Sequence, residues 1–169
     1  MLQDIAAKNC ILTADVIKRK IRRMALQVAE GNTEEASLIV AGIAGNGAVV
    51  AEKLVAELNK ISTIDTQLLT IRINKKEPLD AVVEGGQDFT NKVILVVDDV
   101  SNSGRTLLYA LKPFLNHLPK KIQTLVLVER SHKLYAVQPD YVGLSLATTL
   151  QEHISVETAG TEITGAWLH

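Results

Sequence analysis

The chain has 169 residues, of which 47% are apolar and 22% charged, and its 18 basic side chains nearly balance its 19 acidic ones. This composition predicts one soluble, cytoplasmic globular domain over residues 1–169. The near-neutral charge argues against a surface coated in positive charge for non-specific nucleic-acid binding. A single cysteine, Cys10, excludes an intrachain disulfide, and no apolar run reaches the roughly 20 residues of a membrane span.

The first half of the chain predicts helices and strands in alternation. Residues 13–30 predict a helix, because apolar side chains recur at helical spacing after Thr13, which can cap its start. Residues 37–41 predict a short strand, which leads through the glycine-rich stretch 42–47 into a second helix at about 48–60. Residues 66–73 predict another strand. Residues 74–91 predict a long loop, or a loop with a short hairpin, and loops of this length are usually functional.

The second half continues the alternation. Val93–Val97 is a continuous apolar run, as in a strand that is buried on both faces of a parallel sheet. Residues 104–116 predict a helix, and residues 122–128, 141–146 and about 153–157 predict strands. The whole pattern predicts an α/β fold with a mostly parallel sheet. Because ligands bind beyond the carboxyl ends of such strands, the unusual stretches 42–47 and 98–106 are the candidate site.

The stretch after Val97 combines acidic and small residues. Asp98 and Asp99 follow a buried strand, where two adjacent carboxylates require a diol, a cation or a metal as partner. The small residues after them let backbone N–H groups converge on an anion at the start of a helix, which suits a phosphate monoester. Together the two features predict binding of a phosphorylated sugar, with a capping Asp before a flexible turn as the simpler alternative. The phosphate-binding candidates are Ser101, Asn102, Ser103, Gly104, Arg105 and Thr106.

The segment Val93–Thr106 resembles the phosphoribosyl-diphosphate (PRPP) motif of type I phosphoribosyltransferases. It has that family's order of four apolar residues, two acids, an apolar residue, a variable pair, Ser, Gly, a variable residue and Thr. The resemblance implies a mostly parallel central sheet flanked by helices, with a small hood. It also implies that Asp98 and Asp99 engage the ribose hydroxyls while residues 101–106 hold the 5-phosphate. Mg²⁺ would accompany PRPP and meet the two carboxylates through water rather than directly.

The chain from about residue 11 to 157 is similar to uracil phosphoribosyltransferases and pyrimidine-operon attenuator proteins of the PyrR type. That similarity implies transfer of the ribose 5-phosphate of PRPP to uracil, which gives UMP and pyrophosphate, in a homodimer. It also implies that backbone groups of Val142 and Gly143 bind the base. Asn102 stands where purine enzymes carry an Asp, and an amide has no proton to exchange near neutral pH. A purine acceptor therefore remains the less favoured alternative.

The expected pyrophosphate loop departs from that subfamily. The loop commonly reads Gly-Ile-Lys-Thr-Arg-Gly, and here Ala, Gly and Asn replace Lys-Thr-Arg. We expect backbone N–H groups of the loop to bind pyrophosphate, since glycine allows close approach. We also expect two arginines to supply the missing charge and to act with Asp98 and Asp99 in catalysis. The residues concerned are Ala44, Gly45, Asn46 and Gly47 in the loop, with Arg72 and Arg130 as the arginines.

A basic cluster in the first predicted helix leaves a different class of function open. The cluster is Lys18, Arg19, Lys20, Arg22 and Arg23. Charge runs of this kind usually form a solvated helix face. Proteins of the PyrR type can bind messenger RNA, so the non-enzymatic alternative is an RNA-binding regulator that senses PRPP or a nucleotide, with little or no catalysis.

Overall fold

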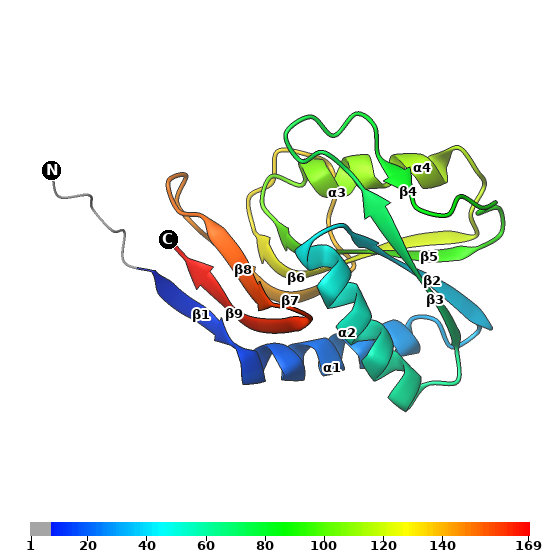
Figure 1. Cartoon of the computed structure of the whole chain (residues 1–169), viewed down its shortest axis with the longest axis horizontal. Coiled ribbons are helices and arrows are strands. Elements are labelled where there is room, and N and C mark those ends of the chain that lie inside the picture. Colours follow the sequence, from blue (N-terminus) through cyan, green and yellow to red (C-terminus); the bar gives the residue numbers. More distant parts are fainter. Residues whose placement is uncertain (1–7) are drawn as a thin grey trace, which may run out of the picture.

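The computed structural model describes residues 8–169, which form two sheets and four helices (Figure 1). The larger sheet has the strand order β4-β3-β2-β5-β6-β7; its strands are parallel except for β4, which is antiparallel to β3 at the edge. Its strands are β2 (Ser37–Ile43), β3 (Asp65–Arg72), β4 (Val82–Val83), β5 (Val93–Ser101), β6 (Lys121–Arg130) and β7 (Tyr141–Leu146). The predicted α/β fold is confirmed, and the loop before β5 does contain a short hairpin strand.

Helices cover both faces of this sheet. Helices α1 (Ala14–Glu30) and α2 (Asn46–Ile61) pack on one face, and the short helices α3 (Arg105–Ala110) and α4 (Lys112–Leu115) pack on the other (Figure 1). The side chains of β5 alternate between two buried clusters: Val93, Leu95 and Val97 face α1 and α2, whereas Ile94 and Val96 face α3 and α4. This double burial is the physical reason for the continuous apolar run in the sequence.

The smaller sheet joins the two ends of the chain. It has the antiparallel order β1-β9-β8, formed by β1 (Asn9–Thr13), β8 (Ile154–Ala159) and β9 (Glu162–Leu168). In Figure 1 this smaller sheet lies beside the end of the larger sheet that carries β6 and β7, and it forms the small hood. Strands β1 and β9 were not predicted, because neither segment alternates clearly and β1 has its partner, β9, at the opposite end of the chain.

Two local predictions change in the structure. The predicted helix 104–116 is interrupted between α3 and α4. Pro113 explains this, because it has no N–H to donate and its ring would clash with the preceding turn. Strand β5 runs to Ser101, so Asp98 and Asp99 lie within the strand rather than after it. The helix predicted at 13–30 is confirmed, with the Val16 N–H donating to Thr13 Oγ1 at 3.4 Å.

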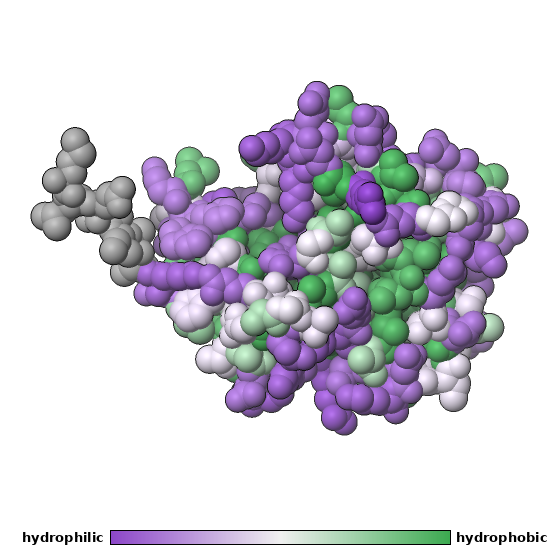
Figure 2. Space-filling view, in the orientation of Figure 1, coloured by the Kyte–Doolittle hydropathy of each residue, from purple (hydrophilic) through white to green (hydrophobic). Residues whose placement is uncertain are grey.

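The surface is mostly hydrophilic on the face shown in Figure 2, where apolar side chains gather near the middle. Strand β3 is one element with an exposed apolar side chain, since Leu68 is 42% exposed. Within residues 8–169, no helix is long and apolar enough to cross a membrane.

Candidate functional site

The two adjacent carboxylates are buried near the end of β5. Asp98 is 2% exposed and Asp99 7% exposed. Asp98 Oδ1 accepts a 2.9 Å hydrogen bond from the Asp99 backbone N–H. Burial, followed by the nearby charge of Asp99, raises the pKa of Asp98 well above its ordinary value. A buried pair of this kind costs free energy unless a cation or hydroxyl groups reach it.

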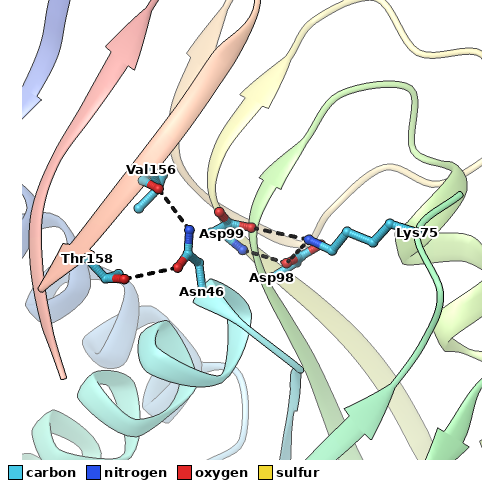
Figure 3. A network of polar contacts seen from close by, with 6 residues as sticks. All are labelled: Asn46, Lys75, Asp98, Asp99, Val156 and Thr158. Carbon is cyan, nitrogen blue, oxygen red and sulfur yellow. Dashed lines mark hydrogen bonds and ion pairs between the residues drawn. The ribbon is translucent and has the colours of Figure 1, made fainter. Parts of the chain in front are cut away.

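A lysine that sequence reasoning did not select reaches the pair. Lys75 Nζ lies 3.7 Å from Asp98 Oδ1 and 3.9 Å from Asp99 Oδ1 (Figure 3). Lys75 belongs to the segment between β3 and β4, and its backbone carbonyl accepts a 3.0 Å hydrogen bond from the Arg105 guanidinium. No signal in the sequence separates Lys75 from Lys76 beside it, since only the path of this segment decides which ammonium meets the carboxylates.

The residues after Asp99 form a cradle. A cavity of about 100 Å³ is lined by Lys75, Asp98 and residues 100–107. Within the described residues, two buried oxygens at this cavity, Ser101 Oγ and Asn102 Oδ1, have no hydrogen-bond partner. Larger hollows exist, such as one of about 780 Å³ near the C-terminal ends of α1 and α2, but this small one is lined by Asp98 and by the loop that follows β5. The predicted phosphate-binding residues are therefore brought together at one cavity.

The cradle is held from outside by the segment after β6. The backbone N–H groups of Leu134 and Tyr135 both donate to the Ser103 carbonyl at 3.0 Å. Gly104 has φ +85°, and a Cβ there would lie 3.3 Å from the Tyr135 carbonyl oxygen. Glycine is thus required both by the left-handed backbone and by the approach of the neighbouring chain. These contacts fix the loop while leaving its inner surface facing the cavity.

The loop 44–47 lies against the carboxylates and the hood. A Cβ at Gly47 would lie 2.8 Å from Asp98 Oδ1, so only glycine fits at this approach. The Asn46 side-chain amide donates to the Val156 carbonyl at 2.8 Å, and Thr158 Oγ1 donates to Asn46 Oδ1 at 3.2 Å. Figure 3 shows Asn46 turned toward β8 and Lys75 on the other side of the carboxylate pair. The Ala44 N–H is bonded to the Ile71 carbonyl, and Gly45 precedes α2 with φ +93°.

The comparisons with known proteins decide the family. The profile described as phosphoribosyl transferase domain matches residues 9–159. This chain belongs to the phosphoribosyltransferase family. It is 32% identical to the bifunctional protein PyrR of Deinococcus deserti, with 96% of each chain covered. It is 30% identical to the bifunctional protein PyrR of Brevibacillus brevis, with 92% of this chain and 93% of the relative covered. The family resemblance of Val93–Thr106 is confirmed.

Solved structures support the same fold. A hypoxanthine-guanine phosphoribosyltransferase from Bacillus anthracis has a TM-score of 0.74 at 19% identity. The superposition covers 94% of this chain and 96% of the Bacillus anthracis chain. A hypoxanthine phosphoribosyltransferase from Trypanosoma cruzi has a TM-score of 0.73 at 15% identity, with 82% of each chain covered. At these identities the likeness shows the phosphoribosyltransferase fold alone.

The two arginines expected to serve this phosphoribosyltransferase as cations are engaged elsewhere. Arg72, the last residue of β3, pairs with Glu84, which directly follows β4, and the Arg72 side chain is largely exposed. The Arg130 guanidinium donates to the Thr149 carbonyl at 2.6 Å. The structure brings neither arginine to Asp98 and Asp99, so their catalytic role stays a prediction.

The two residues expected to bind the base lie within β7. Val142 pairs with Val126 of β6, which itself pairs with Asp98 of β5, so these residues lie two strands away from the carboxylates. The Val142 and Gly143 carbonyls accept hydrogen bonds from Arg23 at 3.0 and 2.9 Å, and Lys20 also donates to Gly143 at 3.0 Å. Base binding by these two residues stays a prediction, and their carbonyls already have partners on α1.

The donor set suits the Mg²⁺ expected in this family. Within residues 8–169, no group of three or more His, Cys, Asp or Glu side chains is placed to hold a metal ion. Mg²⁺ usually keeps several waters and binds one or two carboxylates together with substrate phosphates. The buried pair Asp98 and Asp99 matches that preference. These two carboxylates would hold the ion through water molecules of its shell, with substrate oxygens as direct ligands.

Proposed function

We propose that this protein transfers the 5-phosphoribosyl group of PRPP to uracil and releases pyrophosphate. The observation that carries the proposal is the buried pair Asp98–Asp99 directly beside the 101–106 cradle. Vicinal hydroxyls can donate to two carboxylates, and a phosphate monoester can accept from backbone N–H groups and hydroxyls. A ribose 5-phosphate offers both groups in one molecule.

The expected reaction forms a bond between a ring nitrogen of the base and ribose C1 as the bond from C1 to the diphosphate oxygen breaks. Pyrophosphate leaves with the electron pair, and the proton of the ring nitrogen passes to solvent. Asp98 and Asp99 hold the ribose by its hydroxyls and favour the positive charge that develops on the sugar. When bound, Mg²⁺ would neutralise the diphosphate. We expect residues 74–91 to cover bound PRPP and to exclude water.

Uracil is favoured as the acceptor by two arguments. The similarity to PyrR proteins extends over more than nine-tenths of the chain. Asn102, in the cradle, stands where purine enzymes carry a carboxylate, and an amide cannot exchange a proton near neutral pH. The purine enzymes among the solved structures share the fold with this chain but are under 25% identical to it.

A panel of bases tests the acceptor. Uracil, hypoxanthine and guanine are each incubated with the protein, PRPP and Mg²⁺, and both nucleotide and pyrophosphate are measured. We expect equal amounts of UMP and pyrophosphate with uracil. Turnover of hypoxanthine or guanine without turnover of uracil would contradict the proposal. The double variant Asp98→Asn/Asp99→Asn is the control for the site and should lose PRPP binding.

RNA binding is the second candidate function. Lys18, Arg19 and Arg22 are exposed on α1, whereas Lys20 and Arg23 contact β7, so only part of the basic cluster is used within the fold. An RNA carrying the leader of its own operon should bind with an affinity that falls steeply as salt rises. Binding of that RNA without any conversion of uracil would favour a regulator over an enzyme.

We also expect a cytoplasmic homodimer, as the similarity to PyrR proteins implies. Apolar side chains around the β3–β4 edge are exposed and support a subunit contact: Leu68, Leu79 and Val82. Sedimentation equilibrium tests this expectation, and a mass equal to one chain at micromolar concentration would contradict it.

A further inference from the structure

The leaving diphosphate poses a charge problem for this chain. Pyrophosphate carries several negative charges, yet loop 44–47 contains no basic side chain. Asn46 is bonded to the hood, Arg72 is paired with Glu84, and Arg130 is bonded to the Thr149 carbonyl. A basic side chain that meets the diphosphate beside Mg²⁺ must therefore come from another element.

Lys75 is placed to supply that charge. Its ammonium lies within 4 Å of both carboxylates, at 3.7 and 3.9 Å, and lines the same cavity as the cradle. Both distances are longer than a hydrogen bond, and the side chain is 51% exposed, so the contact is an ion pair free to rearrange. A ribose whose C2 hydroxyl binds these carboxylates carries its diphosphate on the adjacent carbon, C1. In that position of the ribose, the diphosphate would leave within reach of this ammonium.

The backbone of Lys75 is tied to the cradle. The Arg105 guanidinium, at the start of α3, donates to the Lys75 carbonyl at 3.0 Å. Arg105 itself belongs to the loop that lines the cavity. The lysine is thus anchored at its backbone to the expected phosphate-binding loop, while its side chain remains able to move.

We propose that Lys75 binds the diphosphate of PRPP and neutralises it as it leaves, in place of a basic residue in loop 44–47. In the free protein the ammonium is held by Asp98 and Asp99. When PRPP binds, the ribose hydroxyls take over the carboxylates and the ammonium moves to the diphosphate oxygens. The inference rests on the proposed phosphoribosyl transfer, but it does not depend on which base is the acceptor.

Calorimetric binding of two products tests the inference. Pyrophosphate with Mg²⁺ reports the diphosphate position, and UMP reports the ribose 5-phosphate position. For Lys75→Met we expect pyrophosphate affinity to fall about 10- to 100-fold, the loss expected from one charge-assisted hydrogen bond. UMP affinity should stay within about twofold, because the variant keeps the carboxylates and cradle. Lys75→Arg should retain most of the pyrophosphate affinity, since it keeps the charge.

Lys76→Met is the matched control, because this neighbouring lysine is exposed and does not line the cavity. It should bind both products like the unmodified protein. Equal pyrophosphate affinity in Lys75→Met, Lys76→Met and the unmodified protein would overturn the role of Lys75 and leave the proposed reaction standing. If the unmodified protein binds neither product, the proposed function fails as well. A parallel loss of both affinities in Lys75→Met would mean that Lys75 serves the ribose 5-phosphate position or the fold rather than the diphosphate, and would also overturn the inference.

Discussion

The Asn46 side-chain amide donates a 2.8 Å hydrogen bond to the Val156 carbonyl, which ties the first turn of α2 to strand β8 of the hood. The two residues are 110 positions apart in the chain. A second bond, from Thr158 Oγ1 to Asn46 Oδ1, uses the other end of the same amide. Where the PyrR-type loop commonly has an arginine, this chain thus has a side chain that links loop and hood.

Replacement of Asn46 by arginine should remove the hydrogen bonds to the hood and add a positive charge to the pyrophosphate loop. Asn46→Arg should lower the KM for PRPP several-fold by placing a cation at the pyrophosphate loop, and should destabilise the fold by about 1 kcal/mol through the lost hydrogen bonds. Asn46→Ala, the control, should show the same loss of stability without the gain. Kinetics at varied PRPP and urea unfolding measure the two effects. A higher KM for the arginine variant than for the alanine variant would contradict this account.

Gly47 should tolerate no side chain. A Cβ would lie 2.8 Å from Asp98 Oδ1 and 3.1 Å from the Val97 carbonyl oxygen. Gly47→Ala should therefore cost about 1–3 kcal/mol of stability and displace the carboxylate, with a large loss of UMP binding.

Gly31→Ala is the control for this prediction. Its Cβ would lie 2.5 Å from the Tyr141 hydroxyl, and Gly31 follows the C-terminal end of α1. It should lose stability while keeping its affinity for UMP. Equal effects of both variants on UMP binding would show that global destabilisation, not the site, explains the result.

The buried carboxyl of Asp98 should lower the stability of the fold, although it is required for PRPP binding. Its pKa is raised in the folded state by burial and by Asp99, so ionisation costs free energy that the unfolded chain does not incur. The penalty is absent below the unfolded value of 3.8, grows as pH rises toward the folded pKa, and is constant above it. Asp98→Asn should abolish PRPP binding yet raise Tm at pH 7 by about 2–4 °C, as roughly 1 kcal/mol would in a domain of this size.

Thermal unfolding from pH 7 to pH 4 measures this effect. The gain of Asp98→Asn should shrink as pH falls, because the penalty relative to the unfolded chain fades as the pH approaches the unfolded value of 3.8. A variant that melts below the unmodified protein at pH 7 would contradict the expected cost of the buried charge.

Arg23 and Arg19 should differ in their contribution to stability, although both lie in the basic cluster. Arg23 donates to the Val142 and Gly143 carbonyls, so Arg23→Ala should cost about 1 kcal/mol in urea unfolding. Arg19 is exposed, so Arg19→Ala should change stability by less than about 0.5 kcal/mol. If RNA binds to this face of α1, Arg19→Ala should lower the affinity for RNA without changing the stability of the fold. Equal stability losses would mean that the contacts from Arg23 to β7 contribute nothing.

Much of the fold could be predicted where the signal is local. Helix α1 has its cap at Thr13 and its apolar stripe within one segment, and both appear as expected. Strand β5 has a continuous apolar run because neighbours cover both of its faces. The break between α3 and α4 differs from the continuous helix predicted at 104–116, because apolar periodicity continues through Pro113 although its nitrogen cannot donate a helical hydrogen bond.

The sequence by itself determined the family and the core of the site. Asp98, Asp99 and the cradle are contiguous, so their order along the chain already places them together. The tertiary structure decided which further side chains meet them. Lys75 reaches the carboxylates, Asn46 reaches the hood, and Arg23 reaches the β7 carbonyls only because the chain path brings separate elements together. An ammonium or a guanidinium has the same chemistry at any position, so its partner depends on distance in space, which residue order alone does not specify.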